Sequence, residues 1–327
     1  MKAYKIIAVG AALLLACSCG YKEKGTAESN TAVITEIQEI PEDTGVTEAA
    51  KEKKPFVSGT GLLDCNYFDD GYFISWDNRA EEYPSDKKII SGVVPHHLTA
   101  GHLISGFFKA AAKSRSDVET VVIIATSHIE GNESFYTTYF DWNSPFGVVE
   151  TDRDIVSLFC NESGAAVDNE RLIADHSASS HIPFVKHYFP EAKTACLLVA
   201  PGFDKSLPER LADVLYSIPD KEKCLFLFSV DFSHYLSAVE ADRADEITSK
   251  AVSERDYGKI EGFTNDNVDS PFCLSAYVRL SEYFGDDIYE ADNCNTADVL
   301  GIPYSKELYP EGVTSYFVLM TRSDNGG

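Results

Sequence analysis

The chain has 327 residues, which allows one large domain or two small ones. Its net charge of −24 argues against a nucleic-acid partner, because a phosphate backbone demands basic patches. Hydrophobic residues make up 44% of the chain, a normal share for a folded globular protein. The acidic excess is therefore interpreted as a solvated surface.

The first residues have the pattern of a bacterial export signal. Lys2 and Lys5 give a basic start, and residues 6–16 are apolar but too few to span a bilayer. The run Leu-Leu-Ala-Cys that ends at Cys17 resembles the lipobox, whose cysteine is lipidated and becomes the new N-terminus. We expect residues 1–17 to be a lipoprotein signal peptide and a lipid on Cys17 to anchor the protein to a membrane, facing the extracytoplasmic side. The alternatives are an ordinary secretory signal, or acylation of Cys19.

A polar segment separates this signal from the folded part. Residues 18–57 contain almost no aromatic side chains and cannot bury enough apolar surface to fold, so they are interpreted as a flexible tether. Residues 58–327 are expected to form a single domain. Within it, residues 67–83 are aromatic and acidic with several turn signals, which predicts a hairpin or an irregular lead-in.

Three apolar runs are predicted to be buried strands that each lead into a histidine. They are residues 88–95 before His96, residues 120–127 before His128, and residues 224–233 before His234. In parallel sheets the residues that bind ligands lie just beyond the carboxyl ends of the strands. If these strands lie in one parallel sheet, the three histidines converge.

The remaining pattern alternates strands with helices. Helices are expected at residues 98–112, 153–160, 208–216, 239–254 and 270–284, and further strands at residues 194–200 and 312–320. This alternation predicts an α/β fold, a three-layer sandwich with a mostly parallel central sheet.

Three neutral imidazoles are a good ligand set for Fe, Cu or Zn, so the sequence predicts a divalent transition metal whose identity stays open. Asp231 could orient a ligand histidine or cap the next turn. His176 and His181 form a second pair on a polar loop, and we expect them to move protons in the same pocket. The catalytic candidates are therefore His176, His181 and Asp231. The alternative is a loop stabilised by hydrogen bonds of Asp175 and Ser177.

Several short motifs together resemble the Memo-like proteins, whose bacterial members are called AmmeMemoRadiSam system protein B. They are Pro95-His96, Thr126-Ser127-His128, Asp175-His176-Ser177 and the run Ser-Val-Asp-Phe-Ser-His-Tyr at residues 229–235. The resemblance covers residues 88–320 and implies a fold similar to that of the class III extradiol dioxygenases, which are non-haem iron enzymes. It also implies metal ligands at His96, His128 and His234, with a late cysteine as a further ligand in some members.

This sequence departs from the family pattern at that cysteine. Asp269-Ser270 occupies the place of the family's Cys-Gly, and Cys273 lies one helical turn later. Either Asp269 or Cys273 could complete the site. Asp269 would give a harder set of ligands, closer to a histidine and carboxylate site for iron or zinc. A second departure is His97-Leu98-Thr99, which stands where the family has Ala-Gly-Tyr after its Pro-His.

These patterns together predict a lipid-anchored, metal-dependent enzyme that performs an oxidative or hydrolytic reaction on a small molecule. One alternative is a surface module that binds a metal or a partner without catalysis. Another is a structural surface protein held by disulfides among the six cysteines that follow Cys19.

Overall fold

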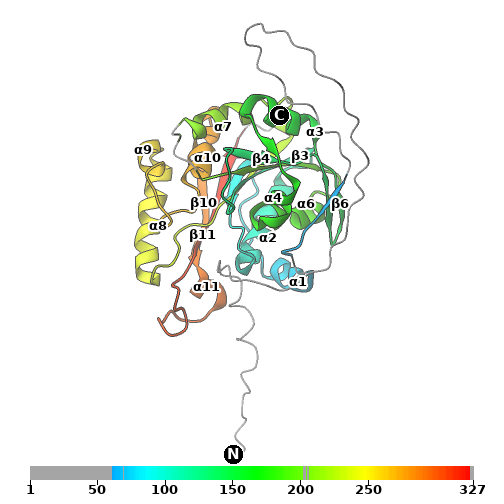
Figure 1. Ribbon diagram of the computed structural model, residues 1–327. Coiled ribbons are helices and arrows are strands. Elements are labelled where there is room, and N and C mark those ends of the chain that lie inside the picture. Colours follow the sequence, from blue (N-terminus) through cyan, green and yellow to red (C-terminus); the bar gives the residue numbers. More distant parts are fainter. Residues whose placement is uncertain (1–60, 69, 202–203, 205, 325–327) are drawn as a thin grey trace, which may run out of the picture. The chain divides into compact units, whose positions relative to one another are not determined.

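The computed structural model describes residues 61–68, 70–201, 204 and 206–324. The predicted signal peptide and tether, and the proposed lipid on Cys17, lie outside these residues. Figure 1 shows the described elements, and none of their helices is long and apolar enough to cross a membrane.

An eight-stranded mixed sheet forms the middle of the domain. In spatial order its strands are β10 (Asp287–Asn295), β11 (Ser315–Ser323), β2 (Lys88–Val94), β9 (Cys224–Ser229), β3 (Thr120–Thr126), β8 (Lys193–Val199), β4 (Phe135–Thr137) and β7 (Ala166–Val167). The four central strands β2, β9, β3 and β8 are parallel, whereas β10, β11 and β4 join by antiparallel pairs. The predicted parallel sheet is thus confirmed for its centre, and the edges make it mixed.

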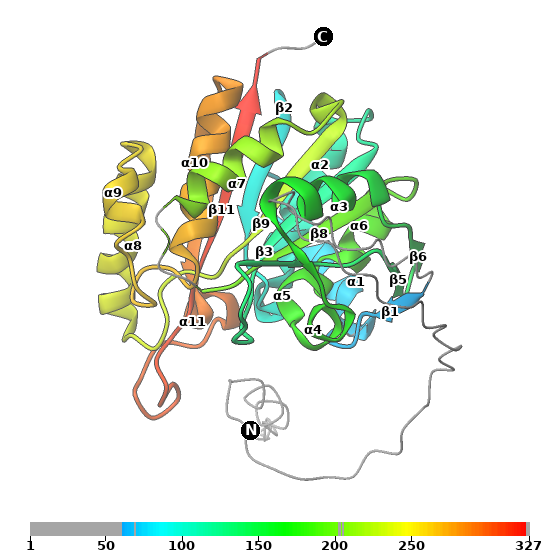
Figure 2. The ribbon, with the colours of Figure 1, turned by 45° about the horizontal axis from the view of Figure 1, so that its top comes forward.

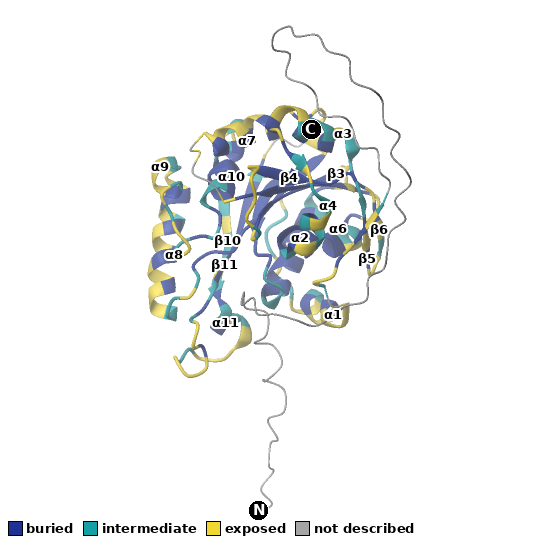
Figure 3. Ribbon diagram, viewed as in Figure 1, coloured by how far each residue is buried: buried dark blue, intermediate teal, exposed yellow. Residues whose placement is uncertain are grey.

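Helices cover both faces of this sheet, which gives the predicted three layers (Figure 2). One face packs on α1 (Asp70–Arg79), α2 (Gly101–Ser114) and α6 (Ile182–Tyr188). The other face packs on α3 (Arg153–Leu158), α7 (Leu207–Tyr216) and α10 (Pro271–Phe284). Successive residues of β3 point to opposite layers, with Val121 and Ile123 in one core and Val122 and Ile124 in the other. Because both faces are covered, the central strands are buried apart from Lys88 and Lys193, the first residues of β2 and β8 (Figure 3).

Smaller elements complete the domain. A three-stranded sheet consists of β1 (Leu62–Asp64), β5 (Asp141–Ser144) and β6 (Gly147–Val149). The other helices are α4 (Asn169–Ala174), α5 (His176–Ser179), α8 (Ala238–Ser253), α9 (Tyr257–Ile260) and α11 (Thr296–Leu300). Short 3-10 and π turns are η1 (Leu98–Ala100), η2 (Phe159–Ser163) and η3 (Lys221–Lys223). The expected cap of α3 is present, because the Asp152 side chain accepts a hydrogen bond from the Ile155 amide.

The expectation of a hairpin or irregular lead-in at residues 67–83 is wrong, because residues 70–79 form helix α1. The turn signals are overridden by aromatic packing. Phe73 and Trp76 are buried and both pack on Phe184 of α6. Gly101, at the start of α2, lets the Trp76 ring approach so closely that a Cβ there would lie 2.4 Å from it.

Gly92 in the middle of β2 generates a stability prediction. A Cβ at this position would lie 2.2 Å from the Phe107 ring and 2.7 Å from the Leu319 carbonyl oxygen, which belongs to the backbone of β11. Gly92→Ala is therefore expected to lower the free energy of unfolding by about 1–3 kcal/mol through overpacking. Denaturant unfolding of this variant measures the effect. The control is Gly258→Ala, because the added Cβ there would meet no atom closer than 3.8 Å. Equal stability of the two variants would contradict this account of the close contact.

Candidate metal centre

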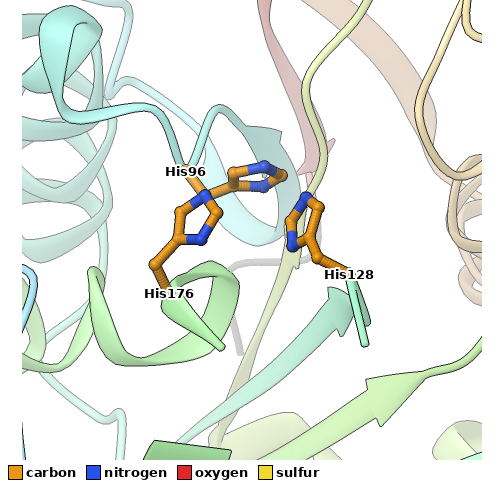
Figure 4. Close-up of side chains that lie close together, drawn as sticks. All are labelled: His96, His128 and His176. Carbon is orange, nitrogen blue, oxygen red and sulfur yellow. The ribbon is translucent and has the colours of Figure 1, made fainter. Parts of the chain in front are cut away.

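Three histidine rings meet beyond the carboxyl ends of the central strands. His96 follows β2, His128 follows β3, and His176 is the first residue of α5. The ring centroids lie 5.0 Å apart for His96 and His128, 5.1 Å for His96 and His176, and 4.7 Å for His128 and His176. One nitrogen from each ring lies within 4.8 Å of the other two, and Figure 4 shows the rings turned toward one another. This arrangement can hold a metal ion.

The Ser229 hydroxyl determines which nitrogen His96 offers. Its oxygen lies 2.6 Å from the Ser177 carbonyl oxygen, 3.2 Å from His96 Nδ1 and 3.0 Å from His181 Nε2. A carbonyl can only accept, so the single hydroxyl proton goes to Ser177 and both histidines must donate to Ser229. His96 therefore carries its proton on Nδ1, which leaves Nε2 as a free lone pair for a metal.

Asp175 acts in the same way on His128. One carboxylate oxygen lies 3.0 Å from His128 Nδ1, and the other accepts the His128 backbone amide at 2.7 Å. Burial opposes the charge of Asp175, but the side-chain hydrogen bond and charge of His128, together with the backbone amides of His128 and Ser177, outweigh it, so the pKa of Asp175 lies below its usual value. Burial acts to lower the pKa of His128, but the hydrogen bond and charge of Asp175, with the charges of Asp269 and Asp231, raise it above its usual value. Nδ1 of His128 is thus the donor, and Nε2 is free to bind a metal, as in many histidine metal sites.

Two carboxylates face the free nitrogen of His96. Nε2 lies 3.6 Å from Asp231 Oδ2 and 3.5 Å from Asp269 Oδ2. Burial and the charge of Asp231 raise the pKa of Asp269 well above its usual value, and Asp269 Oδ1 is buried without a hydrogen-bond partner among the described groups. A lone pair that faces two carboxylates is unfavourable unless a proton or a cation lies between them.

The remaining candidates lie around this group. His234 follows β9 at the same edge of the sheet but is not one of the three clustered rings, and burial lowers its pKa. His181 is fully buried behind His96, and burial lowers its pKa to about 3. His176 stays partly exposed, and burial followed by the charge of His128 lowers its pKa. The sequence analysis expected His96, His128 and His234 to converge, whereas the three rings that meet in the structure are those of His96, His128 and His176.

The cysteine alternatives can be compared directly. Asp269 lies in the site, whereas Cys273 belongs to α10 and is fully buried in the core. Burial raises the pKa of the Cys273 thiol to about 12, which disfavours the thiolate that binds metals. The six cysteines in the described part of the chain are all free, so the disulfide-supported alternative is wrong for these residues.

Sequence reasoning missed two contributors to the site. The sequence marks Ser229 only as the first residue of the motif at residues 229–235, although its hydroxyl accepts hydrogen bonds from His96 and His181. Tyr67 lies far before His176 in the sequence, yet the centroids of their two rings are 5.6 Å apart. A serine at the end of a buried strand was an available signal for Ser229, whereas no local pattern marks Tyr67.

The sequence family described as Memo-like protein matches residues 73–283, more than half of the chain. The chain belongs to the Memo-like family. His96, His128, His176 and His234 all lie within the matched residues, as do Asp231 and Asp269.

Curated relatives carry the same family name. The chain is 28% identical over 177 residues to a MEMO1 family protein of Methanococcoides burtonii, which covers 53% of this chain and 65% of that protein. It is 29% identical over 208 residues to a MEMO1 family protein of Thermococcus onnurineus, which covers 58% of this chain and 69% of that protein. A crystal structure of an uncharacterized protein from Escherichia coli K12 has a TM-score of 0.45 at 12% identity, covering 71% of this chain and 98% of that one. The match spans just under two thirds of the Methanococcoides protein.

The role of Ser229 can be tested by Ser229→Ala. The change leaves two buried N–H groups without an acceptor, so we expect a loss of about 1–3 kcal/mol of stability. Nitrogen-15 NMR of the metal-free protein should show His96 protonated on Nδ1 in the wild type and no single tautomer in the variant. The control is Ser180→Ala, because the Ser180 hydroxyl is buried without a partner among the described groups. Equal stability and unchanged tautomers in both variants would refute the assignment.

Proposed function

We propose that this Memo-like protein is a metal-dependent enzyme whose metal is held by the histidines at the edge of the sheet. The observation that carries the proposal is the convergence of His96, His128 and His176, each with a nitrogen within 4.8 Å of the others. His234 and Asp269 are the further candidate ligands. The substrate is proposed to be a small molecule.

The residues present fit a divalent transition metal in three respects. His96 and His128 both have Nδ1 engaged with an oxygen, which leaves Nε2 for coordination. Asp269 Oδ1 is buried without a hydrogen-bond partner among the described groups, as expected of a ligand atom. The mixture of imidazole and carboxylate groups suits iron or zinc better than a soft ion such as Cu(I).

A bound metal of this kind would polarise a substrate oxygen, or activate water or dioxygen, which includes both oxidative and hydrolytic reactions. The protein groups supply orientation and proton transfer. Asp231 accepts the His96 backbone amide at 3.1 Å and thereby fixes the turn after β2. His176 is partly exposed with a lowered pKa, so a neutral imidazole is available as a base whenever it is not itself a ligand. His181 is fully buried and donates to the Ser229 hydroxyl, which also accepts from His96.

Metal content tests the proposal. The protein purified without a histidine tag or chelator is expected to contain near-stoichiometric Fe, Zn or Cu by elemental analysis. His96→Ala and His128→Ala should lose it, whereas His187→Ala should keep it, because His187 is exposed and packs on Phe73 rather than on the cluster. His176→Ala compared with His234→Ala would identify the third imidazole ligand. No metal in the wild type, even after reconstitution, would refute the proposal and favour a binding module.

We also propose that the enzyme is a bacterial lipoprotein that faces the extracytoplasmic side. The support is the sequence of residues 1–17, with its basic start, short apolar run and Leu-Leu-Ala-Cys ending. Mass spectrometry of the N-terminal peptide from the membrane fraction should find a lipidated Cys17. Cys17→Ser should move the protein out of that fraction, whereas Cys19→Ser should not. An unmodified N-terminus that includes Met1 would contradict the anchor.

A further inference from the structure

Tyr67 lies against the candidate metal centre although it comes from the start of the described chain. Its ring centroid is 5.6 Å from that of His176, at an interplanar angle of 58°. Its hydroxyl donates a hydrogen bond of 2.8 Å to the Ala174 carbonyl oxygen. With 46% of its surface exposed, the Tyr67 side chain lies at the protein surface rather than inside the core.

The segment that carries Tyr67 is fixed on both sides. Before it, β1 pairs in parallel with β5, and the Cys65 amide donates to the Asn143 carbonyl at 3.2 Å. After it, the Phe68 ring packs on Phe184 at 5.6 Å and on Trp76 at 5.7 Å. Figure 2 shows β1 beside α4, the helix that ends at Ala174. Tyr67 is thus held between two anchored neighbours and has little freedom to move away.

The hydrogen bond of Tyr67 reaches the turn on which the site depends. Ala174 is followed directly by Asp175, which holds both the amide and the ring of His128. His176 comes next and supplies a ring of the cluster. One side chain therefore contacts both ends of a three-residue turn that controls two of the three clustered imidazoles.

We propose that Tyr67 is a positioning residue that fixes the turn at residues 174–176 and covers one side of the His176 ring. Tyr67 lies outside residues 73–283, the part of the chain that matches the family. The centre is therefore completed by a side chain from the segment that precedes the matched region. The effect on metal binding rests on the proposed function, whereas the shielding of His176 does not.

The first experiment measures that shielding in the full-length, metal-free protein. Diethyl pyrocarbonate acylates neutral imidazoles, and peptide mass spectrometry gives its rate at each histidine. Tyr67→Ala is expected to raise the rate at His176 several-fold, and Tyr67→Phe is expected to stay near the wild-type rate because the ring remains. The matched control is Tyr72→Ala, another half-exposed tyrosine, which stacks on Trp76 and should leave the His176 rate unchanged.

A second readout separates positioning from general stability. For the metal-loaded protein, Tyr67→Ala is expected to weaken metal binding roughly 10-fold, the size typical of lost outer contacts to a ligand. Tyr67→Phe should bind the metal more tightly than Tyr67→Ala but less tightly than the wild type. Tyr72→Ala should bind it as tightly as the wild type, although its unfolding midpoint is expected to be similar to that of Tyr67→Ala. A wild-type His176 rate in Tyr67→Ala would overturn the inference. A raised rate in a protein that binds no metal would support the shielding and refute the proposed function instead.

Discussion

Parallel pairing of three neighbouring strands is the constraint on which the site depends. β2, β9 and β3 lie side by side and run in the same direction, so the residues that follow them emerge at one edge of the sheet. His96 and Asp231 follow two of these strands, and His128 follows the third. Burial on both faces prevents the strands from slipping, because each face has its own apolar core. The positions of the His96 and His128 imidazoles are therefore consequences of strand register more than of local loop structure.

A buried hydrogen-bond network then orients the rings that the strands deliver. Ser229 uses its full capacity of one donated and two accepted bonds, and Asp175 accepts from a backbone amide and from an imidazole. Such groups are costly to bury unless every partner is present. The network accordingly fixes one protonation pattern in which both His96 and His128 direct an unprotonated nitrogen toward the centre. This pattern leaves each of the two rings a nitrogen that could bind a metal ion.

The sequence predicted the layers of the fold and the two histidines after β2 and β3, because apolar runs and their polar ends are local signals. It did not predict the mixed edges of the sheet, since the direction of β10, β11 and β4 depends on pairing between distant segments. It named His176 as a candidate for proton transfer but not as a member of the ring cluster, because a residue on a polar loop has no strand to indicate where its ring lies. Helix α1 was missed for a related reason, as the aromatic contacts of Phe73 and Trp76 outweigh local turn preferences.

The free cysteines have a consequence for the redox chemistry of this fold. Burial raises the pKa of Cys65, Cys196, Cys224, Cys273 and Cys294 to about 12. These thiols therefore stay protonated at neutral pH, and thiolates are the species that exchange with disulfides and react with oxidants. These five thiols therefore act as inert packing groups, and the described part of the fold needs no disulfide to complete it.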